Sequence, residues 1–595
     1  MRELCVDLET HYASDYSLKT LSSVEYVRDP RFLIHGMAVL DDGKAPFWVP
    51  GAQLQDFVAK IDWADTRLIS HTYFDSLVLC DRFGVRPAEF VDTAGLARAL
   101  IGGDADLARL MPLLDLGEKG DDLKETKGLR QLPMHLYDRL ASYALNDVMG
   151  CWGIYRLLYP MLPDVEKKLL SLTGRISSIG VLRINHEVIS AGLQELEAEQ
   201  QRVIDASGVP ASVLRSNQQF SAYVRDTLGL EPPTKLNEKG QEIGAFSKND
   251  IEFNRFRAQH PELEHVWKAK LAAMSNSDIK RAQRFKNISK LGDGTLPMLQ
   301  NYWGAHTGRA SGGGGLNVQN LVRGSATRLC LEAPPGYQVL VADSSNIELR
   351  VNAWFAGQED VLQVLRDGGD VYSHVASAHF GYKVTKKTHP DERQFGKLLS
   401  LGLGFSMGWK KFQTVCALGF MGAPPVRMTD EEAYQTVMTW RRNNHAIVAM
   451  WKTLGELIPT MLDENNHTVL GPVVLKHECV EMPNGTHLLY TGLKWDHETE
   501  SWRYMGHHKL TPGLFDENIV QSLARHIVFE QKLQIDALDG VTVVGSTHDE
   551  VIAIAPTDRA PSAMDEMLAI MRQPPSWAPD LPLDAEGGWA QNYSK

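Results

Sequence analysis

Residues 336–350 read GYQVLVADSSNIELR, and this stretch decides the class of fold. Its apolar residues form a short run that is typical of a buried strand, and the run ends at Asp343. A carboxylate at the end of a buried strand is exposed where a sheet meets a cleft, which makes Asp343 a candidate catalytic residue. The competing interpretation is that Asp343 caps a helix that begins near Asn346, because Asp is a favoured capping residue.

A second pair of acids, Asp549 and Glu550, lies in VVGSTHDEVIAIA (residues 543–555). Strand-like runs flank these acids and His548, which predicts a tight turn between two strands. The alternative is a polar turn tip, although such tips are usually rich in Gly and Asn. If Asp343 and Asp549 meet at neighbouring strand ends, they form a site for two metal ions, and their hard oxygens suit Mg²⁺ or Mn²⁺.

Between these acids, residues 391–409 read DERQFGKLLSLGLGFSMGW. Four residues of this stretch are spaced by four, so on a helix they lie on one slowly drifting stripe: Arg393, Lys397, Leu401 and Phe405. The two cations suit a triphosphate, and the apolar residues suit stacking on a base. The alternative is an amphipathic helix with a solvated basic face. Gly402 and Gly404 fit that alternative poorly, because glycine inside a helix is costly and often marks close approach of a ligand or backbone.

The N-terminal part alternates short apolar runs with helical patterns, as α/β domains do. Asp7 and Glu9 lie in the predicted strand CVDLET, where alternation puts both carboxylates on one face. Asp75 starts a helical pattern, and Tyr143 precedes Asp147 by one turn of a long helix. Taken singly, these are a solvated strand face, a helix cap and a surface acid beside a half-buried tyrosine. Together, four carboxylates would repel one another unless Mg²⁺ or Mn²⁺ ions fill the site.

Length and composition bound these interpretations. The chain has 595 residues, enough for two to four domains, and 43% of them are apolar. With 61 basic and 74 acidic residues the net charge is −13, which excludes a generic polyanion binder, so DNA would need local basic patches. The six cysteines show no zinc-binding spacing, and no apolar stretch is long enough to span a bilayer. We expect a soluble, cytoplasmic protein with reduced thiols.

In their order, the motifs resemble those of family A DNA polymerases, the group of bacterial DNA polymerase I. DSSNIELR is similar to the first palm motif, the R-x3-K-x7-F pattern to the fingers helix, and HDE to the third palm motif. HTGRASGGGGLNVQNL (residues 306–321) resembles the T-G-R…N-x-Q-N segment of the family. ENIVQSLAR (residues 517–525) resembles the helix that holds the primer–template minor groove. Near the N-terminus, the order D-x-E, Asp, Y-x3-D resembles the 3′–5′ proofreading exonucleases.

The resemblance implies a multidomain α/β and α+β protein. An RNase H-like exonuclease domain would be followed by a right-hand polymerase domain with palm, thumb and fingers. The expected divisions are an exonuclease domain at 1–163, a helical connector and thumb at 164–291, a first palm segment at 292–350, fingers at 351–465, and a second palm segment at 466–595.

The resemblance also implies roles for single residues. The polymerase site would use as catalytic residues Asp343, Asp549 and Glu550, with two Mg²⁺ ions, or Mn²⁺ ions, on Asp343 and Asp549. The dNTP would contact Arg393, Lys397, Leu401, Phe405, Glu348 and Tyr372, with Glu348 excluding a 2′-OH. DNA would contact Arg309, Gln521 and His548. The exonuclease site would hold two ions on Asp7, Glu9, Asp75 and Asp147, with Tyr143 orienting the attacking water.

Several positions depart from the pattern of the family. His71 stands where many exonucleases have Asn, and Ser344 stands where the palm motif usually has Tyr. In the fingers motif, Leu401 replaces an aromatic residue, and Phe405-Ser406 replaces Tyr-Gly. None of these changes removes a metal ligand or a phosphate-binding cation, although sugar selection is expected to differ.

The leading hypothesis is a DNA-directed DNA polymerase with a proofreading exonuclease, acting on primer–template DNA and dNTPs. We expect a monomer that meets no membrane, with accessory replication proteins as optional partners. Because the exonuclease motif starts at Asp7, the chain has the compact plan of bacteriophage replicative enzymes, which implies phage genome replication in a host cytoplasm. The first alternative is a nuclease whose polymerase-like half only binds DNA. A DNA-binding protein without activity and an RNA polymerase of related fold are the others, and Glu348 argues against the last.

Overall fold

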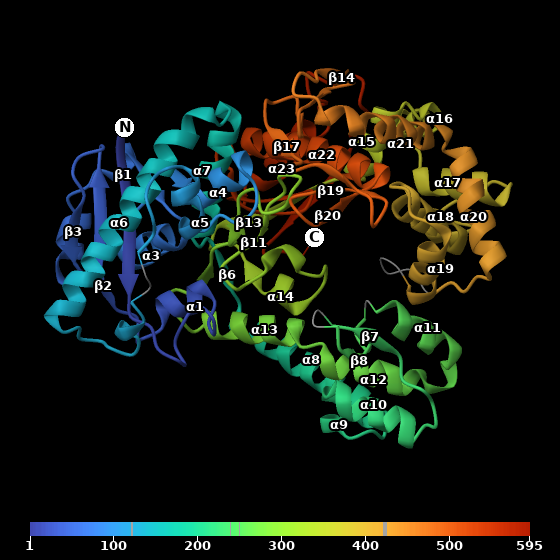
Figure 1. Ribbon diagram of the computed structural model, residues 1–595, viewed down its shortest axis with the longest axis horizontal. Coiled ribbons are helices and arrows are strands. Elements are labelled where there is room, and N and C mark those ends of the chain that lie inside the picture. Colours follow the sequence, from blue (N-terminus) through green and yellow to red (C-terminus); the bar gives the residue numbers. More distant parts are fainter. Residues whose placement is uncertain (121–122, 238–239, 249, 420–424, 595) are drawn as a thin grey trace. The chain divides into compact units, whose positions relative to one another are not determined.

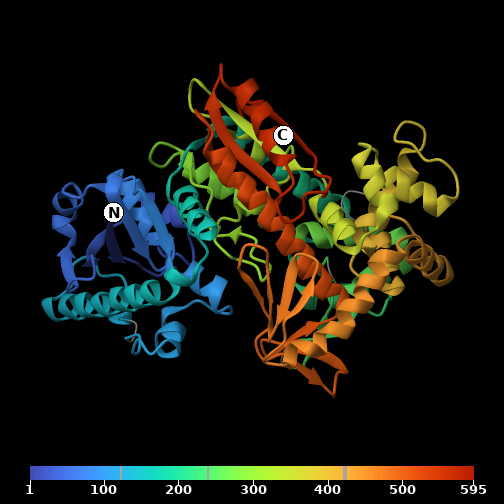
Figure 2. The same cartoon turned by 90° about the horizontal axis from the view of Figure 1, so that it is seen from above.

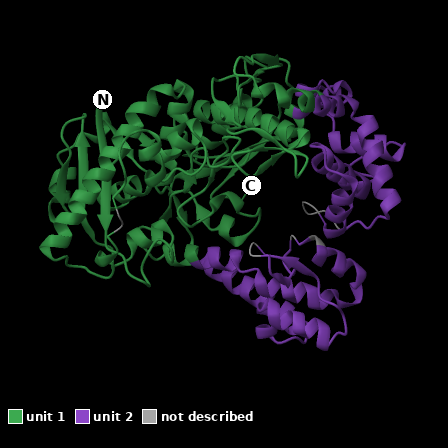
Figure 3. Ribbon diagram, in the orientation of Figure 1, with its two compact units in different colours: residues 1–186, 284–351, 453–595 green, residues 187–283, 352–452 purple. Residues whose placement is uncertain are grey.

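The computed structural model describes residues 1–120, 123–237, 240–248, 250–419 and 425–594. The chain divides into two compact units (Figure 3). The first unit comprises residues 1–186, 284–351 and 453–595, and the second comprises residues 187–283 and 352–452. Each unit is therefore assembled from segments that lie far apart in the sequence.

A five-stranded sheet forms the N-terminal part of the first unit, with the strand order β3-β2-β1-β4-β5. The central strand, β1, pairs antiparallel with β2 and parallel with β4, and β4 pairs parallel with β5. The strands are β1 (Arg2–Thr10), β2 (Ile34–Asp41), β3 (Phe47–Pro50), β4 (Thr66–Ser70) and β5 (Glu89–Asp92). The apolar runs that predicted strands in this part of the sequence form β1, β2 and β4, which confirms that prediction.

Helices cover this sheet. They are α1 (Ser23–Arg28), α2 (Leu54–Val58), α3 (Phe74–Phe83), α4 (Thr93–Leu100), α5 (Leu107–Leu113), α6 (Met134–Leu158) and α7 (Asp164–Ser178). The long helix α6 packs on β1 and β2, and α7 packs on β5 and α3 (Figures 1 and 2). The helical pattern expected from about Pro133 to Leu162 is α6, and Pro133 is its N-cap residue.

A four-stranded antiparallel sheet forms the second centre of the first unit, with the order β21-β22-β13-β23. Its strands are β13 (Tyr337–Ser344), β21 (Thr542–Thr547), β22 (Glu550–Pro556) and β23 (Ala585–Ala590). The helices α22 (Pro512–Asp536) and α23 (Ala560–Met571) pack on each other, α22 against β21 and α23 against β13 and β23. Six of the seven residues of β22 are buried, which explains why its sequence is a nearly continuous apolar run.

Smaller sheets complete the first unit. Strand β6 (Leu182–Ile184) pairs with β9 (Thr295–Leu296) and β12 (Leu331–Glu332), and β10 (Gln300–Asn301) pairs with β11 (Ser311–Gly312). Residues 468–510 form two further sheets from β14 (Thr468–Leu470), β15 (Val473–Lys476), β16 (Cys479–Glu481), β17 (His487–Leu489), β18 (Lys494–Asp496), β19 (Ser501–Tyr504) and β20 (His508–Leu510). The hairpin expected at Pro483-Asn484-Gly485 is confirmed, because this turn joins the antiparallel strands β16 and β17.

The second unit is mainly helical. Its first segment contains α8 (His186–Ala206), α9 (Ala211–Arg215), α10 (Asn217–Asp226), α11 (Ile251–Gln259), α12 (Glu264–Met274), most of α13 (Ser277–Ile288), and the short strands β7 (Thr234–Leu236) and β8 (Glu242–Gly244). The core of this segment is aromatic, with Trp267 packed against Phe220, Phe253 and Phe256. This helical character confirms what the polar, helix-patterned sequence predicted.

The other segment of the second unit carries the predicted fingers. Its helices are α16 (Glu359–Arg366), α17 (Val371–Phe380), α18 (Pro390–Leu403), α19 (Trp409–Leu418), α20 (Asp430–Asn443) and α21 (His445–Leu457). Leu399 and Phe412 are fully buried here, in one cluster with Trp440 and Trp451. The short helix α14 (Ala326–Leu329) and the helix α15 (Ile347–Ala356) lie on either side of β13 in the sequence.

Two general features of the chain bear on its chemistry. Cys479 is half-buried, and the other five cysteines are buried as free thiols. Among the described residues, no helix combines the length and the apolar character that a membrane crossing requires.

Candidate active sites

The first acid cluster lies where β13 meets the turn between β21 and β22. In the register of the sheet, Asp343 on β13 faces Glu550 on β22, and the backbone N–H of Ser344 donates to the carbonyl of Asp549 over 3.1 Å. The sequence VVGSTHDEVIAIA does form a β-hairpin with His548 and Asp549 at its turn. Asp343 and Asp549 therefore lie at neighbouring strand ends, which is the arrangement that the expected two-metal site requires.

The carboxyl groups of this cluster are held close together in a poorly hydrated place. Burial raises the pKa of Asp343 to about 7, and the nearby charges of Glu550, Asp549 and Glu586 add to the effect. Burial also raises the pKa of Asp549, against the opposing charge of Arg309. Crowded carboxylates of this kind are the donor set that a hard divalent cation prefers.

Arg309 links two members of this cluster. Its Nη2 atom lies 2.7 Å from Oε1 of Glu348 and 2.8 Å from Oδ1 of Asp549. The neighbouring Thr307 donates its hydroxyl hydrogen to Oε1 of Gln521 on α22 over 2.8 Å. Four residues expected to contact the nucleotide, the metal or the DNA therefore lie together in the first unit: Arg309, Glu348, Gln521 and Asp549.

Glu550 and His548 have different surroundings. Glu550 is buried, with Oε2 accepting from Arg328 over 2.7 Å and Oε1 accepting from the hydroxyl of Tyr593. Arg328 also lies over the Tyr593 ring, 3.8 Å from its centroid. His548 is exposed, and its φ of +51° places it in the left-handed region. The structure thus ties Glu550 into a buried network, whereas His548 remains available to a ligand.

Two glutamine side chains hold the turn that carries Asp549 by hydrogen bonds. The side-chain amides of Gln300 and Gln319 both donate to the carbonyl of Ser546, over 2.7 and 2.8 Å. The side-chain Oε1 atom of Gln319 in turn accepts from the backbone N–H of His548. Gln300, Arg328 and the role of Gln319 could not be predicted from the sequence, because nothing local signals a contact with a strand more than 200 residues away.

The fingers helix is α18, and the structure corrects one expectation about it. The helix ends at Leu403, so it carries Arg393, Lys397 and Leu401 in steps of four but not Phe405. Gly404, the residue at its C-terminal cap, keeps right-handed helical backbone angles, and Ser406, the residue after Phe405, has a φ of +64°. The predicted four-residue stripe therefore holds for three residues.

Arg393 is already paired within the second unit. Its guanidinium contacts Asp370 in a two-point ion pair and lies 5.4 Å from the ring centroid of Tyr372 on α17. Tyr372, expected to contact the triphosphate, thus stands beside the cation expected to do the same.

The closest backbone approach to a glycine of α18 is at Gly396, whereas Gly404, just after the helix, has a backbone oxygen 3.2 Å from an added Cβ atom. A Cβ atom added to Gly396 would stand 2.2 Å from the carbonyl oxygen of Tyr372, whereas one added to Gly402 would stand 3.5 Å from the ring of Phe412. Gly396 is therefore what lets α17 and α18 pack so closely. The tightest packing thus occurs at a glycine that lies earlier in α18 than the glycines named from the sequence.

The second acid cluster lies on the five-stranded sheet and the helices that cover it. Asp7 and Glu9 share one face of β1, as their spacing predicted. Asp75, in the first turn of α3, accepts from the backbone N–H of Leu8 over 3.1 Å, so it joins α3 to β1 and is not the capping residue, which is Tyr73. Tyr143 and Asp147 lie one turn apart on α6, and Asp147 is buried.

The charges of these four carboxylates act on one another. Burial raises the pKa of Asp7 to about 7, helped by the charge of Asp147. Burial raises the pKa of Glu9 and Asp75 well above their ordinary values, and the charge of Asp7 contributes to both shifts. The four acids predicted from three separate motifs are thus brought together by the fold, beside a cavity of about 560 Å³ that Tyr143 lines.

A lysine that the sequence analysis missed enters this cluster. Nζ of Lys119 lies 3.2 Å from Oδ2 of Asp147 and 5.4 Å from the ring centroid of Tyr143. Burial acts to lower the pKa of Lys119, but hydrogen bonding to Tyr143 and the charge of Asp147 keep it above its ordinary value. Lys119 lies between α5 and α6, in a segment with no regular secondary structure, where no motif drew attention to it.

The two clusters fit a divalent cation by donor chemistry, but not as preformed cages. Over the described ranges, no three His, Cys, Asp or Glu side chains are arranged to enclose a metal ion. In each cluster a basic side chain approaches an acid instead: Lys119 at Asp147 and Arg309 at Asp549. The carboxylates are the right ligands, and small side-chain movements would be needed to converge them on an ion.

His71, the departure from the exonuclease pattern, has a packing role. Nδ1 of His71 lies 2.8 Å from the hydroxyl of Thr93, and its surroundings include a hydrogen bond to the backbone of Ala105. Burial lowers the pKa of His71. The side chain therefore joins the end of β4 to α4 and to the loop that follows.

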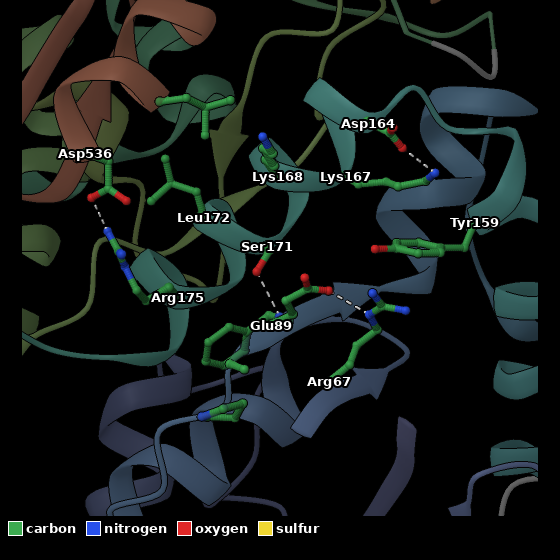
Figure 4. A pocket seen from close by; sticks show the side chains of 14 residues that line it. Arg67, Glu89, Tyr159, Asp164, Lys167, Lys168, Ser171, Leu172, Arg175 and Asp536 are labelled. Carbon is green, nitrogen blue, oxygen red and sulfur yellow. Dashed lines mark hydrogen bonds and ion pairs between the residues drawn. The ribbon is translucent and has the colours of Figure 1, made fainter. Parts of the chain in front are cut away.

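A cavity of about 660 Å³ lies away from both acid clusters, between the β4–β5 edge, α7 and α22 (Figure 4). Three of its cations are paired at the cavity wall: Arg67 with Glu89, Lys167 with Asp164, and Arg175 with Asp536 (Figure 4). Three acids thus pair with three of the cations of the cavity, and Lys168 is a fourth cation that lines it (Figure 4).

Comparison with known proteins adds relatives to this geometry. Residues 182–452 match the sequence model of DNA polymerase family A. The DNA polymerase of Bacillus phage SP02 is 24% identical over 100% of this chain and 100% of its own length. The thermostable DNA polymerase I of Thermus thermophilus is 27% identical over 48% of this chain, which corresponds to 34% of that relative. The chain thus matches about a third of the Thermus enzyme and all of the phage protein.

The fold has a counterpart among solved structures. The POL domain of Pol1 from M. smegmatis, in complex with DNA primer–template and dNTP, has a TM-score of 0.68 and 15% identity over 100% of this chain and 96% of that domain. At this identity the likeness concerns the fold. The segment that matches DNA polymerase family A, residues 182–452, contains the first palm motif and the fingers helix, and the phage relative extends the likeness over the whole chain.

Proposed function

We propose that the protein is a DNA-directed DNA polymerase that extends a primer 3′-OH with dNTPs on a DNA template. The observation that carries this proposal is the pairing of β13 with the β21–β22 hairpin, which sets Asp343 beside Asp549 in a chain that is similar to this family. Both carboxyl groups have a raised pKa in a crowded, poorly hydrated place. The carboxylate oxygens of such a pair are suited to divalent cations.

Family A polymerases depend on divalent metal, and the cluster is proposed to hold two Mg²⁺ ions, with Mn²⁺ as a substitute, on Asp343 and Asp549. When bound, the ions would activate the 3′-OH and neutralise charge on the transferring phosphate. The residues of the chain supply the remainder. Arg309 would leave its two acids to contact the minor groove together with Gln521, which reads acceptors common to all correct pairs. Glu550 would keep the turn in place, and His548 would contact DNA.

The second unit would supply the contacts to the nucleotide. Arg393 and Lys397 are proposed to bind the triphosphate, with Arg393 exchanging Asp370 for phosphate and Tyr372 beside it. Leu401 and Phe405 would pack on the base and sugar. Glu348 would exclude the 2′-OH of a ribonucleotide.

A second activity is proposed for the N-terminal sheet, namely 3′–5′ exonucleolytic proofreading. Its strand order, with a central strand antiparallel to one neighbour and parallel to the other, is that expected of an RNase H-like domain. Asp7, Glu9, Asp75 and Asp147 would hold two divalent ions. The Tyr143 hydroxyl would orient the water that attacks the terminal phosphodiester.

The biological setting is proposed by likeness to the phage polymerase. The protein would replicate a phage genome as a monomer in the cytoplasm of a host cell, with primer–template DNA and dNTPs as its partners.

A labelled primer–template assay with Mg²⁺ tests both activities. We expect extension with dNTPs that is lost in Asp343→Ala, and primer shortening without dNTPs that is lost in Asp7→Ala. Asp565→Ala, which removes an exposed acid of α23, is the control and should change neither.

The remaining outcomes of this assay decide against parts of the proposal. Shortening with no extension under any dNTP mixture would favour a nuclease whose polymerase-like half only grips DNA. An unchanged primer under all conditions would leave a DNA-binding protein and would refute both site assignments.

A further inference from the structure

Lys119 lies in the second acid cluster, and the loop that carries it is held against α6. Its ammonium lies 3.2 Å from Oδ2 of Asp147, and the exposed fractions of the two side chains are 25% and 4%. The same ammonium feels the charges of Asp7 and Glu9, which identifies it as the cation at the centre of the cluster. Lys119 therefore differs from a solvated surface lysine in a chance ion pair.

The segment around Lys119 is attached to α6 on both sides of the lysine. The carbonyl of Glu118 accepts from Nδ2 of Asn146 over 3.1 Å. Leu116 packs so closely on α6 that a Cβ atom at Gly153 would stand 2.6 Å from its side chain. After Lys119, Gly120 packs against the ring of Tyr143, where an added Cβ atom would stand 3.3 Å from the ring.

These attachments fix the backbone of Lys119 on the helix that also carries Tyr143 and Asp147. The side chain that reaches the acids is therefore aimed at them by the loop, while its flexible stem leaves the ammonium free to move away. A lysine suits such a role, since its charge is compact and its stem has several rotatable bonds.

We propose that Lys119 is the built-in counter-ion of the nuclease acids, and that it must leave Asp147 before a divalent cation can bind there. This inference rests on the proposed exonuclease function. Without the lysine, four carboxylates would face one another in a poorly hydrated place, which is costly. With it, the metal-free protein is spared part of that repulsion, and the affinity of the site for metal is lowered because one cation has to replace another.

Direct binding of Mn²⁺ tests this proposal without any measurement of activity. Every protein in the experiment is the full chain carrying Asp343→Asn, which weakens the other metal site. Mn²⁺ is titrated into each protein and the free ion is measured by electron paramagnetic resonance. In the parent protein, the Mn²⁺ that Asp7→Asn abolishes defines the nuclease site.

We expect Lys119→Met to bind this Mn²⁺ at least about ten-fold more tightly than the parent, because a competing unit charge beside Asp147 is gone. Lys119→Arg keeps the charge and should bind like the parent or more weakly. Lys127→Met removes an exposed lysine from the same connection between α5 and α6 and should leave the affinity unchanged.

Thermal unfolding in EDTA gives a second readout that does not depend on metal. Lys119→Met should unfold at a lower temperature than the parent, whereas Lys119→Arg should recover most of the difference. If Lys119→Met lowered the unfolding temperature so far that titration failed, Lys119→Gln, which keeps a hydrogen-bond donor, would take its place.

The outcomes separate this inference from the function on which it rests. Equal or weaker Mn²⁺ binding by Lys119→Met, with an Asp7-dependent site present in the parent, would overturn the counter-ion role alone. No Asp7-dependent Mn²⁺ binding in the parent would overturn the proposed nuclease site, and the inference with it.

Discussion

At the scale of single residues, each acid cluster contains a basic side chain that offsets its charge. Lys119 pairs with Asp147 in one, and Arg309 joins Asp549 to Glu348 in the other. Carboxylates that must gather for chemistry repel one another in the metal-free protein, and each basic side chain reduces that cost. The acids thus destabilise the metal-free protein, although the proposed chemistry requires them.

Replacing Asp343 with Asn should remove primer extension and stabilise the metal-free protein. Because the pKa of Asp343 is raised from 3.8 to about 7, the folded protein holds a proton that the unfolded chain releases. The free energy of unfolding therefore falls as pH rises through that window. We expect Asp343→Asn to unfold at a higher temperature than the unmodified protein in EDTA at pH 8, by less at pH 5. A lower unfolding temperature at pH 8 would contradict this reasoning.

Shortening Glu348 should weaken discrimination against ribonucleotides. Its carboxylate stands in the polymerase cluster next to Arg309, where it is proposed to crowd a 2′-OH. In Glu348→Ala the ratio of kcat/KM for dNTP over rNTP should fall at least about ten-fold. Glu348→Gln keeps the bulk of the side chain and should retain most of the discrimination. If the two variants gave equal ratios of kcat/KM, discrimination against ribonucleotides would not depend on the size of the side chain at position 348.

At the scale of elements, periodicity located the helices and strands better than it located their ends. The four-residue spacing from Arg393 onward predicted α18, but the helix ends at Leu403, before Phe405, and the backbone enters the left-handed region only at Ser406. The short strands β6, β9 and β12 carry no signal of their own, since each is only two or three residues long and exists through its pairing. Short strands of this kind depend on partners that are distant in sequence.

Two glycines of α18 provide a matched test of helix packing. Gly396→Ala would set a Cβ atom 2.2 Å from the backbone of Tyr372, so α17 and α18 would have to separate. We expect a loss of about 1–3 kcal/mol in unfolding free energy and a raised KM for dNTP. Gly402→Ala meets only ordinary contacts and should be neutral or gain about 0.5–1 kcal/mol from its better helix propensity. Chemical denaturation of both variants measures the difference, and equal effects would be inconsistent with the close approach at Gly396.

At the scale of the whole molecule, a buried ion pair joins parts of the first unit that lie far apart in sequence. Glu166 on α7 and Arg525 on α22 have fully buried side chains and form a two-point ion pair. Tyr302 and Asn484 donate to the same carboxylate, over 2.6 and 2.8 Å. Nε of Arg525 also donates to the carbonyl of Gly308, directly before Arg309. This network therefore connects the end of the N-terminal region to the first acid cluster.

Breaking this pair should be costly, and removing both partners less so. Arg525→Met leaves Glu166 buried without its counter-charge and should cost about 3–5 kcal/mol of unfolding free energy. The double variant Glu166→Leu, Arg525→Met should recover part of the loss. Urea denaturation of the two single variants and the double variant measures the coupling, and strictly additive losses would argue against it.

The same pair predicts a response to acid. Although burial opposes ionisation, Arg525 holds the pKa of Glu166 at about 2, below its ordinary value of 4.5. The folded protein therefore keeps the carboxylate ionised where the unfolded chain takes up a proton. The stability from this pair is present above pH 4.5 and is lost as pH falls toward 2, so Glu166→Gln should flatten the loss of stability over that range. An unchanged acid profile in Glu166→Gln would contradict the low pKa.

From the sequence alone, the acids of both clusters were predicted together with the strand, turn or helix on which each lies. Spacing along a strand or helix sets which side chains share a face, so Asp7 with Glu9, Tyr143 with Asp147, and the His548–Asp549 turn were all predictable. Only the tertiary structure decided which charges meet. Lys119 with Asp147, Arg309 with Glu348, and Glu166 with Arg525 come from segments separated by as few as 28 or as many as 359 residues. Local geometry repeats with a short period and can be read from neighbours, whereas Coulomb and burial energies depend on distances that the packed fold alone sets.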